Sequence, residues 1–86
     1  MYYTYRTKGT CSRAISFNID ENDVVTNVEF VGGCDGNLQG ISRLVDGMTG
    51  DEILSKCKGI LCGNKPTSCP DQLAQAVVAA REAMKP

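Results

Sequence analysis

The stretch RAISFNIDENDVVTNVEFV, residues 13–31, decides the fold. It contains two runs of alternating apolar and polar side chains, 13–20 and 24–31, around the polar segment DEND at 20–23. Alternation with a period of two is typical of half-buried strands, and a short polar connection between two such runs predicts an antiparallel hairpin. One face of this hairpin is expected to carry Ile15, Phe17, Ile19, Val24, Val28 and Phe30.

Outside the hairpin, an aromatic run at 2–6 predicts a third strand, joined through Gly9. Downstream the apolar spacing becomes helical. Residues 37–46 form one expected helix, with Leu38, Ile41, Leu44 and Val45 at helical spacing. The sequence TGDE at 49–52 has the pattern of a capping box. It predicts the start of a second helix, which carries Ile53, Leu54 and Cys57.

A third helix is expected from about Pro70 to Lys85. Its apolar stripe would consist of Leu73, Val77, Ala80 and Met84, with Asp71, Gln75, Glu82 and Lys85 on the opposite side. The whole chain, 1–86, is therefore predicted to be one α+β domain: a small antiparallel sheet of about three strands with about three helices on one face. A domain of this size buries only about 60–65% of its unfolded surface, so a cross-link or a metal would help to stabilise it.

Composition excludes several function classes. The net charge of −1 and the absence of tryptophan give no indication of a nucleic-acid partner. No apolar run approaches the roughly 18 residues that cross a bilayer, and the N-terminal segment MYYTYRTKGT lacks an apolar signal region. We therefore expect a cytoplasmic protein without membrane contact. Because the chain has no histidine, Ser-His-Asp and Cys-His catalysis within it are excluded.

Five cysteines are the most informative residues of this chain. In a reducing compartment, clustered cysteines point to metal binding or redox chemistry rather than to disulfides, and an odd number leaves one thiol over. Of the five, Cys57 lies inside a predicted helix and is expected to pack in the core. The other four lie at structural breaks and are the predicted metal ligands: Cys11, Cys34, Cys62 and Cys69.

Cys69 lies in the segment TSCPD, residues 67–71, at the predicted start of the last helix. Proline is favoured in the first helical turn, so either Cys69 or Ser68 would be the N-cap. The positive end of the helix dipole stabilises a thiolate there. Cys69 also shares a helix face with Leu73 and Ala76, so its sulfur is expected to point into the domain.

Three interpretations of the four cysteines stay open. The first is a tetrahedral zinc site, which would cross-link a domain that is too small to be stabilised well by its core alone. The second is a dithiol that exchanges with a partner's disulfide. The third is an iron–sulfur cluster. Against all three stands simple packing of small apolar thiols, because the chain contains no CxxC pair. The segment VGGCDGNLQG matches no phosphate-binding pattern and is read as a strand-to-helix turn.

The segments KPTSCPDQLAQAV, GGCDGNLQGI and GILCG resemble the TSCPD domain family, in particular its small stand-alone bacterial members with four cysteines. The resemblance covers nearly the whole chain and implies the same four cysteines. Related domains lie at the C-terminus of some vitamin-B12-dependent ribonucleotide reductases. The resemblance thus implies an accessory or interaction module linked to ribonucleotide reductase or nucleotide metabolism, or a redox module that supplies such a reductase with electrons. A chain of 86 residues has no room for a complete ribonucleotide reductase, so no complete enzyme is expected. The expected partner is an unidentified protein, with a ribonucleotide reductase as the candidate, and a homo-oligomer is compatible with the sequence.

Overall fold

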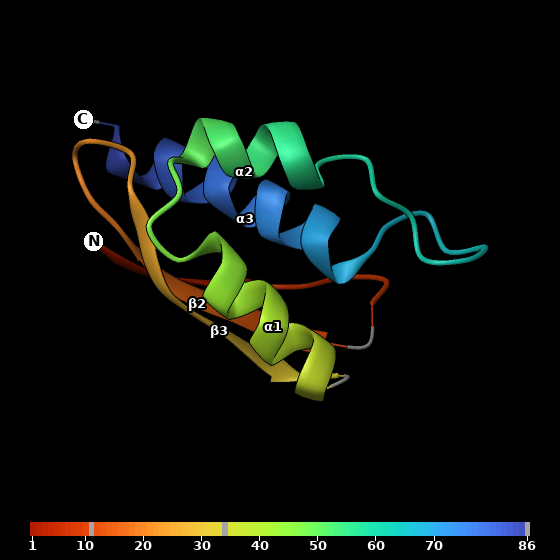
Figure 1. The fold of residues 1–86 in the computed structure, drawn as a ribbon. Coiled ribbons are helices and arrows are strands. Elements are labelled where there is room, and N and C mark those ends of the chain that lie inside the picture. The colour runs from red at the N-terminus through yellow and green to blue at the C-terminus, as the bar shows by residue number, and fades with distance from the viewer. Residues whose placement is uncertain (11, 34, 86) are drawn as a thin grey trace.

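In a computed structural model, residues 1–10, 12–33 and 35–85 are described. The elements follow in the order β1 (Tyr2–Arg6), β2 (Ser12–Ile19), β3 (Val25–Gly32), α1 (Asp35–Val45), α2 (Gly50–Cys57) and α3 (Cys69–Met84). The strands form an antiparallel sheet in the order β1-β2-β3, and the helices lie on one side of it (Figure 1). The α+β prediction is confirmed, as is the capping box of α2 at Thr49 and Glu52.

The core forms between β2 and α3. Ile15, Phe17 and Ile19 are buried on the helix-covered face, as their alternation predicts. They pack with the fully buried α3 side chains Leu73 and Val77 in one apolar cluster. Helix α2 adds Ile53 and Cys57 to this cluster from the far side of α3 (Figure 1). Burial of this continuous surface supplies most of the driving force for folding.

At the start of β3, the structure differs from the prediction in which valine is buried. Val25 is fully buried, whereas Val24, which the alternation placed on the buried face, is only half-buried. The register between β2 and β3 shifts here, so that β3 carries one extra residue, and Asn27 has a positive φ of 55°. Such a bulge reverses the alternation, so Val25 and Val28 both face the core although they are three residues apart. Asp46 stabilises the bulge by accepting a 3.0 Å hydrogen bond from the Asn27 amide.

A second register shift lies between Ser12 and Ala14, where β2 carries the extra residue. The Ser12 side chain is buried, while Arg13 is exposed. The alternation that runs from Ile15 to Ile19 therefore does not continue upstream of Ala14. Side chains at this end of β2 cannot be assigned to a face by counting residues.

The helices correct three further predictions. Met84, which was placed in the apolar stripe of α3, is exposed at the last residue of that helix. Leu44 is 75% exposed although it was placed in the apolar stripe of α1. It precedes the buried Val45 by one residue, and one residue turns a helix by about 100°, so both cannot face the sheet. Asp71 was placed on the solvent side of α3, but only 6% of it is exposed. None of the described helices is long and apolar enough to cross a membrane.

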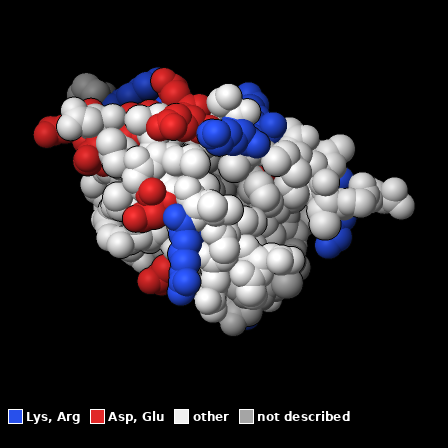
Figure 2. All heavy atoms as spheres, viewed as in Figure 1, with Lys and Arg blue, Asp and Glu red and all other residues white. Residues whose placement is uncertain are grey.

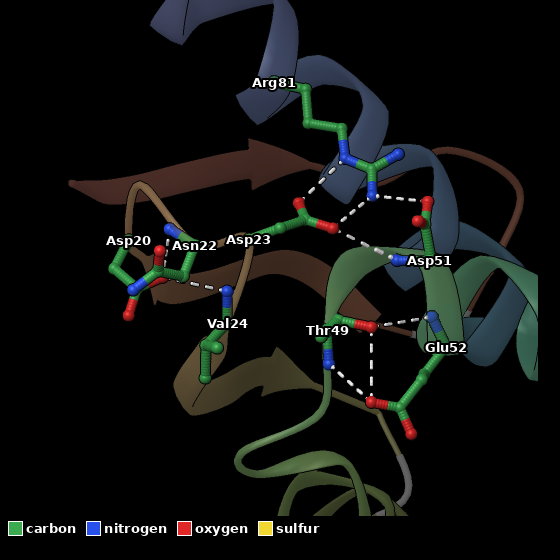
Figure 3. A network of polar contacts seen from close by, with 8 residues as sticks. All are labelled: Asp20, Asn22, Asp23, Val24, Thr49, Asp51, Glu52 and Arg81. Carbon is green, nitrogen blue, oxygen red and sulfur yellow. Dashed lines mark hydrogen bonds and ion pairs between the residues drawn. The ribbon is translucent and has the colours of Figure 1, made fainter.

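An ionic cluster ties the β2–β3 turn to α2 and α3 (Figure 3). Arg81 donates hydrogen bonds to Asp23 at 2.9 and 2.5 Å and to Asp51 at 3.0 Å. The Gly50 amide donates to the Asp23 carbonyl at 2.8 Å. A Cβ at Gly50 would lie 2.6 Å from Arg81 Nη2 and 2.7 Å from Asp23 Oδ1, so the close approach of these groups requires glycine.

This cluster makes stability depend on pH. The Arg81 hydrogen bonds hold the pKa of Asp23 below its usual range, against an opposing effect of burial. A carboxyl whose pKa is lowered in the folded state stabilises the protein above its unfolded pKa, and that contribution is lost as pH falls through the folded value. We expect Arg81→Met to reduce the steepness with which the unfolding free energy declines below about pH 5. Urea unfolding between about pH 5 and pH 2 measures this; parallel curves for both proteins would contradict the pairing.

Candidate functional site

The TSCPD motif, residues 67–71, begins helix α3. Ser68 is the N-cap, Cys69 is the first helical residue and Pro70 follows it, so the second of the two predicted caps is the correct one. The Ser68 hydroxyl accepts a 3.1 Å hydrogen bond from the Asp71 amide and donates a 2.6 Å bond to the Ile60 carbonyl. One side chain thus starts the helix and fixes the loop that precedes it.

Asp71 is the buried centre of this motif. Its carboxylate accepts hydrogen bonds from the Thr67 hydroxyl, from the Gly59 amide at 2.7 Å and from Gln75 Nε2 at 2.9 Å. The Thr67 hydrogen bond, with those from the Gly59 amide and Gln75, lowers the pKa of Asp71 although burial opposes the shift; the nearby positive charge of Lys58 acts in the same direction. Asp71 therefore joins α3 to both ends of the α2–α3 connection as a hydrogen-bonded carboxylate.

The β1–β2 connection rests against the same motif. The Lys8 amide donates to Gln72 Oε1 at 3.0 Å, and Gln72 Nε2 donates to the Thr67 hydroxyl at 3.1 Å. Gly9 has a φ of +74°, and a Cβ there would lie 3.2 Å from the Thr67 methyl group. Sequence analysis predicted that β1 joins β2 through Gly9. It did not predict that this connection packs against residues far away in the sequence, such as Thr67 and Gln72.

Cys69 points into the molecule, as its shared helix face predicts. It is 8% exposed, and its Sγ lies 3.3 Å from the hydroxyl of the buried Ser12. Ser12 begins β2 and pairs in the sheet with Gly32 near the end of β3. The Cys69 sulfur therefore faces the end of the sheet where two strands meet.

The other cysteines divide into three groups. Cys57 is buried in the apolar cluster, as predicted, and burial raises the pKa of its thiol. Cys62 is exposed in the α2–α3 connection, where its amide donates to the Thr67 carbonyl at 3.1 Å. The predicted ligands Cys11 and Cys34 lie outside the described residues. Within residues 1–10, 12–33 and 35–85, no three His, Cys, Asp or Glu residues form a group that could hold a metal ion.

Comparison with known proteins identifies the chain. The family model described as TSCPD domain matches residues 3–80. The chain belongs to the TSCPD domain family. No curated protein and no solved structure matches it significantly. The match of this TSCPD domain includes the sheet, helices α1 and α2, and most of α3 with the motif at its start.

Sequence reasoning missed two polar positions of this TSCPD domain. Ser12 and Gln72 are both buried. Ser12 contacts Cys69 of the motif across the fold, while Gln72 contacts Thr67 locally and Lys8 across the fold. No sequence signal could have found Ser12, because its contact depends on the β2 bulge. The Thr67–Asp71 pair had a signal, since residues four apart at a helix start face each other.

The core position of Cys57 leads to a mutational prediction. We expect Cys57→Ala to lower the unfolding free energy by about 1 kcal/mol or somewhat more, because a small buried group is lost. Metal content should not change, because this thiol lies inside the apolar cluster. Urea unfolding and elemental analysis of the variant check both parts. Complete loss of metal would show that Cys57 is a ligand.

Proposed function

We propose that this TSCPD domain binds one zinc ion through Cys11, Cys34, Cys62 and Cys69 and acts as an accessory or interaction module. The observation that carries the proposal is the environment of Cys69. It is a buried sulfur at a helix N-terminus, and it faces the end of the sheet rather than the apolar cluster. A thiol that only packs would be expected among apolar side chains, as Cys57 is.

The chain order around Cys69 supports the proposed ligand set. Ser12 touches the Cys69 sulfur and is the sequence neighbour of Cys11. Gly32 pairs with Ser12 and precedes Cys34 by two residues. The Cys62 amide is bonded to Thr67, two residues before Cys69. Segments adjacent to all four cysteines thus come together around the start of α3.

The donor set fits zinc. Four thiolates are typical of closed structural zinc sites, and such a site contributes directly to folding free energy. When bound, zinc would supply a cross-link between β2, β3 and the α2–α3 connection and would leave no open coordination position for chemistry. The module would then act by docking on a protein partner, for which a ribonucleotide reductase is the candidate that the family resemblance suggests.

One observation favours a second candidate, a thiol–disulfide module that supplies electrons to such a reductase. Cys62 is exposed while Cys69 is buried at a helix N-terminus. Exposed thiols can attack a partner's disulfide, and a helix N-terminus favours the thiolate state of the second thiol.

Alkylation separates the two candidates. Reduced, chelator-free protein is treated with iodoacetamide, and each cysteine is followed by mass spectrometry with and without prior chelation. In the zinc protein, Cys62 should be protected until the chelator is added, despite its exposure. Immediate modification of Cys62 without chelator, together with a measurable disulfide reduction potential, would support the redox module and contradict zinc.

A further inference from the structure

The charges of this chain are separated along the sheet. Residues 1–19 contain three basic side chains, Arg6, Lys8 and Arg13, and no Asp or Glu. Acidic residues are concentrated at the other end, around the β2–β3 turn and the start of α2. Figure 2 shows acidic side chains, with basic ones beside them, gathered at the end of the molecule that carries the C-terminus. The net charge of −1 conceals this separation.

The basic end contains a hollow of about 500 Å³ on β1, β2 and their connection. Its volume lies within the range typical of small-molecule sites, about 300–1,000 Å³. Among the residues that the structure describes, no carboxylate lines it. The lining residues are Arg6, Thr7, Thr10, Ser12, Arg13 and Ala14.

The β2 bulge explains why two arginines line this hollow. Arg6 at the end of β1 pairs with Ala14, and cross-strand partners share a face of the sheet. Arg13 is the extra residue of the bulge, and bulges redirect side chains relative to regular alternation. The Arg13 side chain passes over Gly32, where an added Cβ would lie 3.3 Å from Nε.

Both guanidinium groups are available to a ligand. In the part of the chain that the structure describes, neither Arg6 nor Arg13 forms an ion pair, whereas Arg81 pairs with two carboxylates. The Thr7 and Thr10 hydroxyls donate to the Ser12 carbonyl at 2.5 and 3.3 Å. These two hydroxyls are therefore engaged, whereas the arginines keep N–H groups for a ligand. A guanidinium presents N–H groups in a planar fork that matches the oxygens of a phosphate.

We propose that this hollow binds the terminal phosphate of a small phosphorylated molecule. Two guanidinium charges match the two negative charges of a phosphate monoester and exceed the single charge of a diester. The described lining residues include none of the four proposed zinc ligands, and the proposed phosphate contacts are made by arginine side chains rather than by a metal. Because the hollow is open and salt screens exposed charges, we expect a dissociation constant on the order of 1 mM at low salt.

Titration of the ¹⁵N-labelled protein with phenyl phosphate tests the proposal. At about pH 8 the monoester is fully dianionic, and chloride keeps the ionic strength constant. We expect saturable shifts at the amides of Thr7, Ser12 and Ala14. Binding should weaken about tenfold or more in Arg6→Gln and in Arg13→Gln, because each loses a charge-assisted contact. Arg43→Gln, which removes the same charge from an exposed position in α1, should bind like the parent.

Two further ligands test whether the hollow prefers phosphate monoesters to diesters. Inorganic phosphate should compete with phenyl phosphate at the same amides, whereas dimethyl phosphate, a singly charged diester, should bind at least tenfold more weakly. Absence of saturable shifts up to about 20 times the expected dissociation constant would overturn the proposal. Equal weakening in Arg43→Gln and Arg13→Gln, or equal binding of monoester and diester, would also overturn it. Each single variant is an exposed substitution whose folding is checked in the same spectra.

Discussion

Replacing Asp71 by alanine is expected to lower the unfolding free energy by about 2 kcal/mol or more. The carboxylate accepts hydrogen bonds from Thr67, Gly59 and Gln75 in a position that is 6% exposed. Removal of this acceptor leaves the buried Thr67 hydroxyl without its acceptor, and a buried, unsatisfied group costs about 1–3 kcal/mol. The Thr67 hydroxyl is the most affected, because Thr67 is itself buried, whereas Gly59 and Gln75 are exposed and can bond to water instead.

Urea unfolding at neutral pH measures this loss. Asp51→Ala is the matched control: Asp51 is also an aspartate in the first turn of a helix, but it is paired with Arg81 and 88% of its side chain is exposed. Exposed ion pairs contribute at most about 1 kcal/mol, so the control should lose little. Asp71→Asn should fall between the two, since it keeps the shape and one acceptor oxygen but not the charge. Equal losses in Asp71→Ala and Asp51→Ala would contradict the role of Asp71 as the centre of the motif.

Replacing Cys69 by serine is expected to have the second large effect, namely loss of bound zinc together with several kcal/mol of stability. Serine preserves the shape of the side chain but is a poor zinc ligand. The buried position and the Ser12 contact remain available to a hydroxyl. Most of the loss should therefore come from the metal rather than from packing.

A chelator distinguishes these two sources. In its presence, parent and Cys69→Ser should differ by only about 1 kcal/mol, the usual worth of one buried polar contact. Without chelator the difference should be several times larger, and Cys57→Ala should show no such chelator dependence. A Cys69→Ser effect that is the same with and without chelator would assign this thiol to packing alone.

The fold could largely be predicted from the sequence because its elements are strongly periodic. Ile15, Phe17 and Ile19 define the buried face of β2, and the Thr49–Glu52 capping box defines the start of α2. The errors arise where a bulge breaks the period. Val24 and Val25 exchange roles because β3 carries one additional residue, and periodicity within a single strand does not reveal a partner's register.

The candidate site was less predictable, because its polar contacts join residues distant in sequence. The helix start at Ser68 and the inward direction of Cys69 followed from local rules. The contacts of Ser12 with Cys69 and of Lys8 with Gln72 depend on how the β1–β2 connection packs on α3. Asp71 was placed on the solvent side because charge alone suggests exposure, although paired carboxylates at helix starts can be buried.

The most direct test of the zinc proposal is elemental analysis of freshly purified protein, kept reduced and free of chelator, with metal counted per chain. The account predicts one zinc per chain in the parent and in Cys57→Ala, and near zero in Cys69→Ser. A parent protein whose zinc content is near zero under these conditions would contradict it.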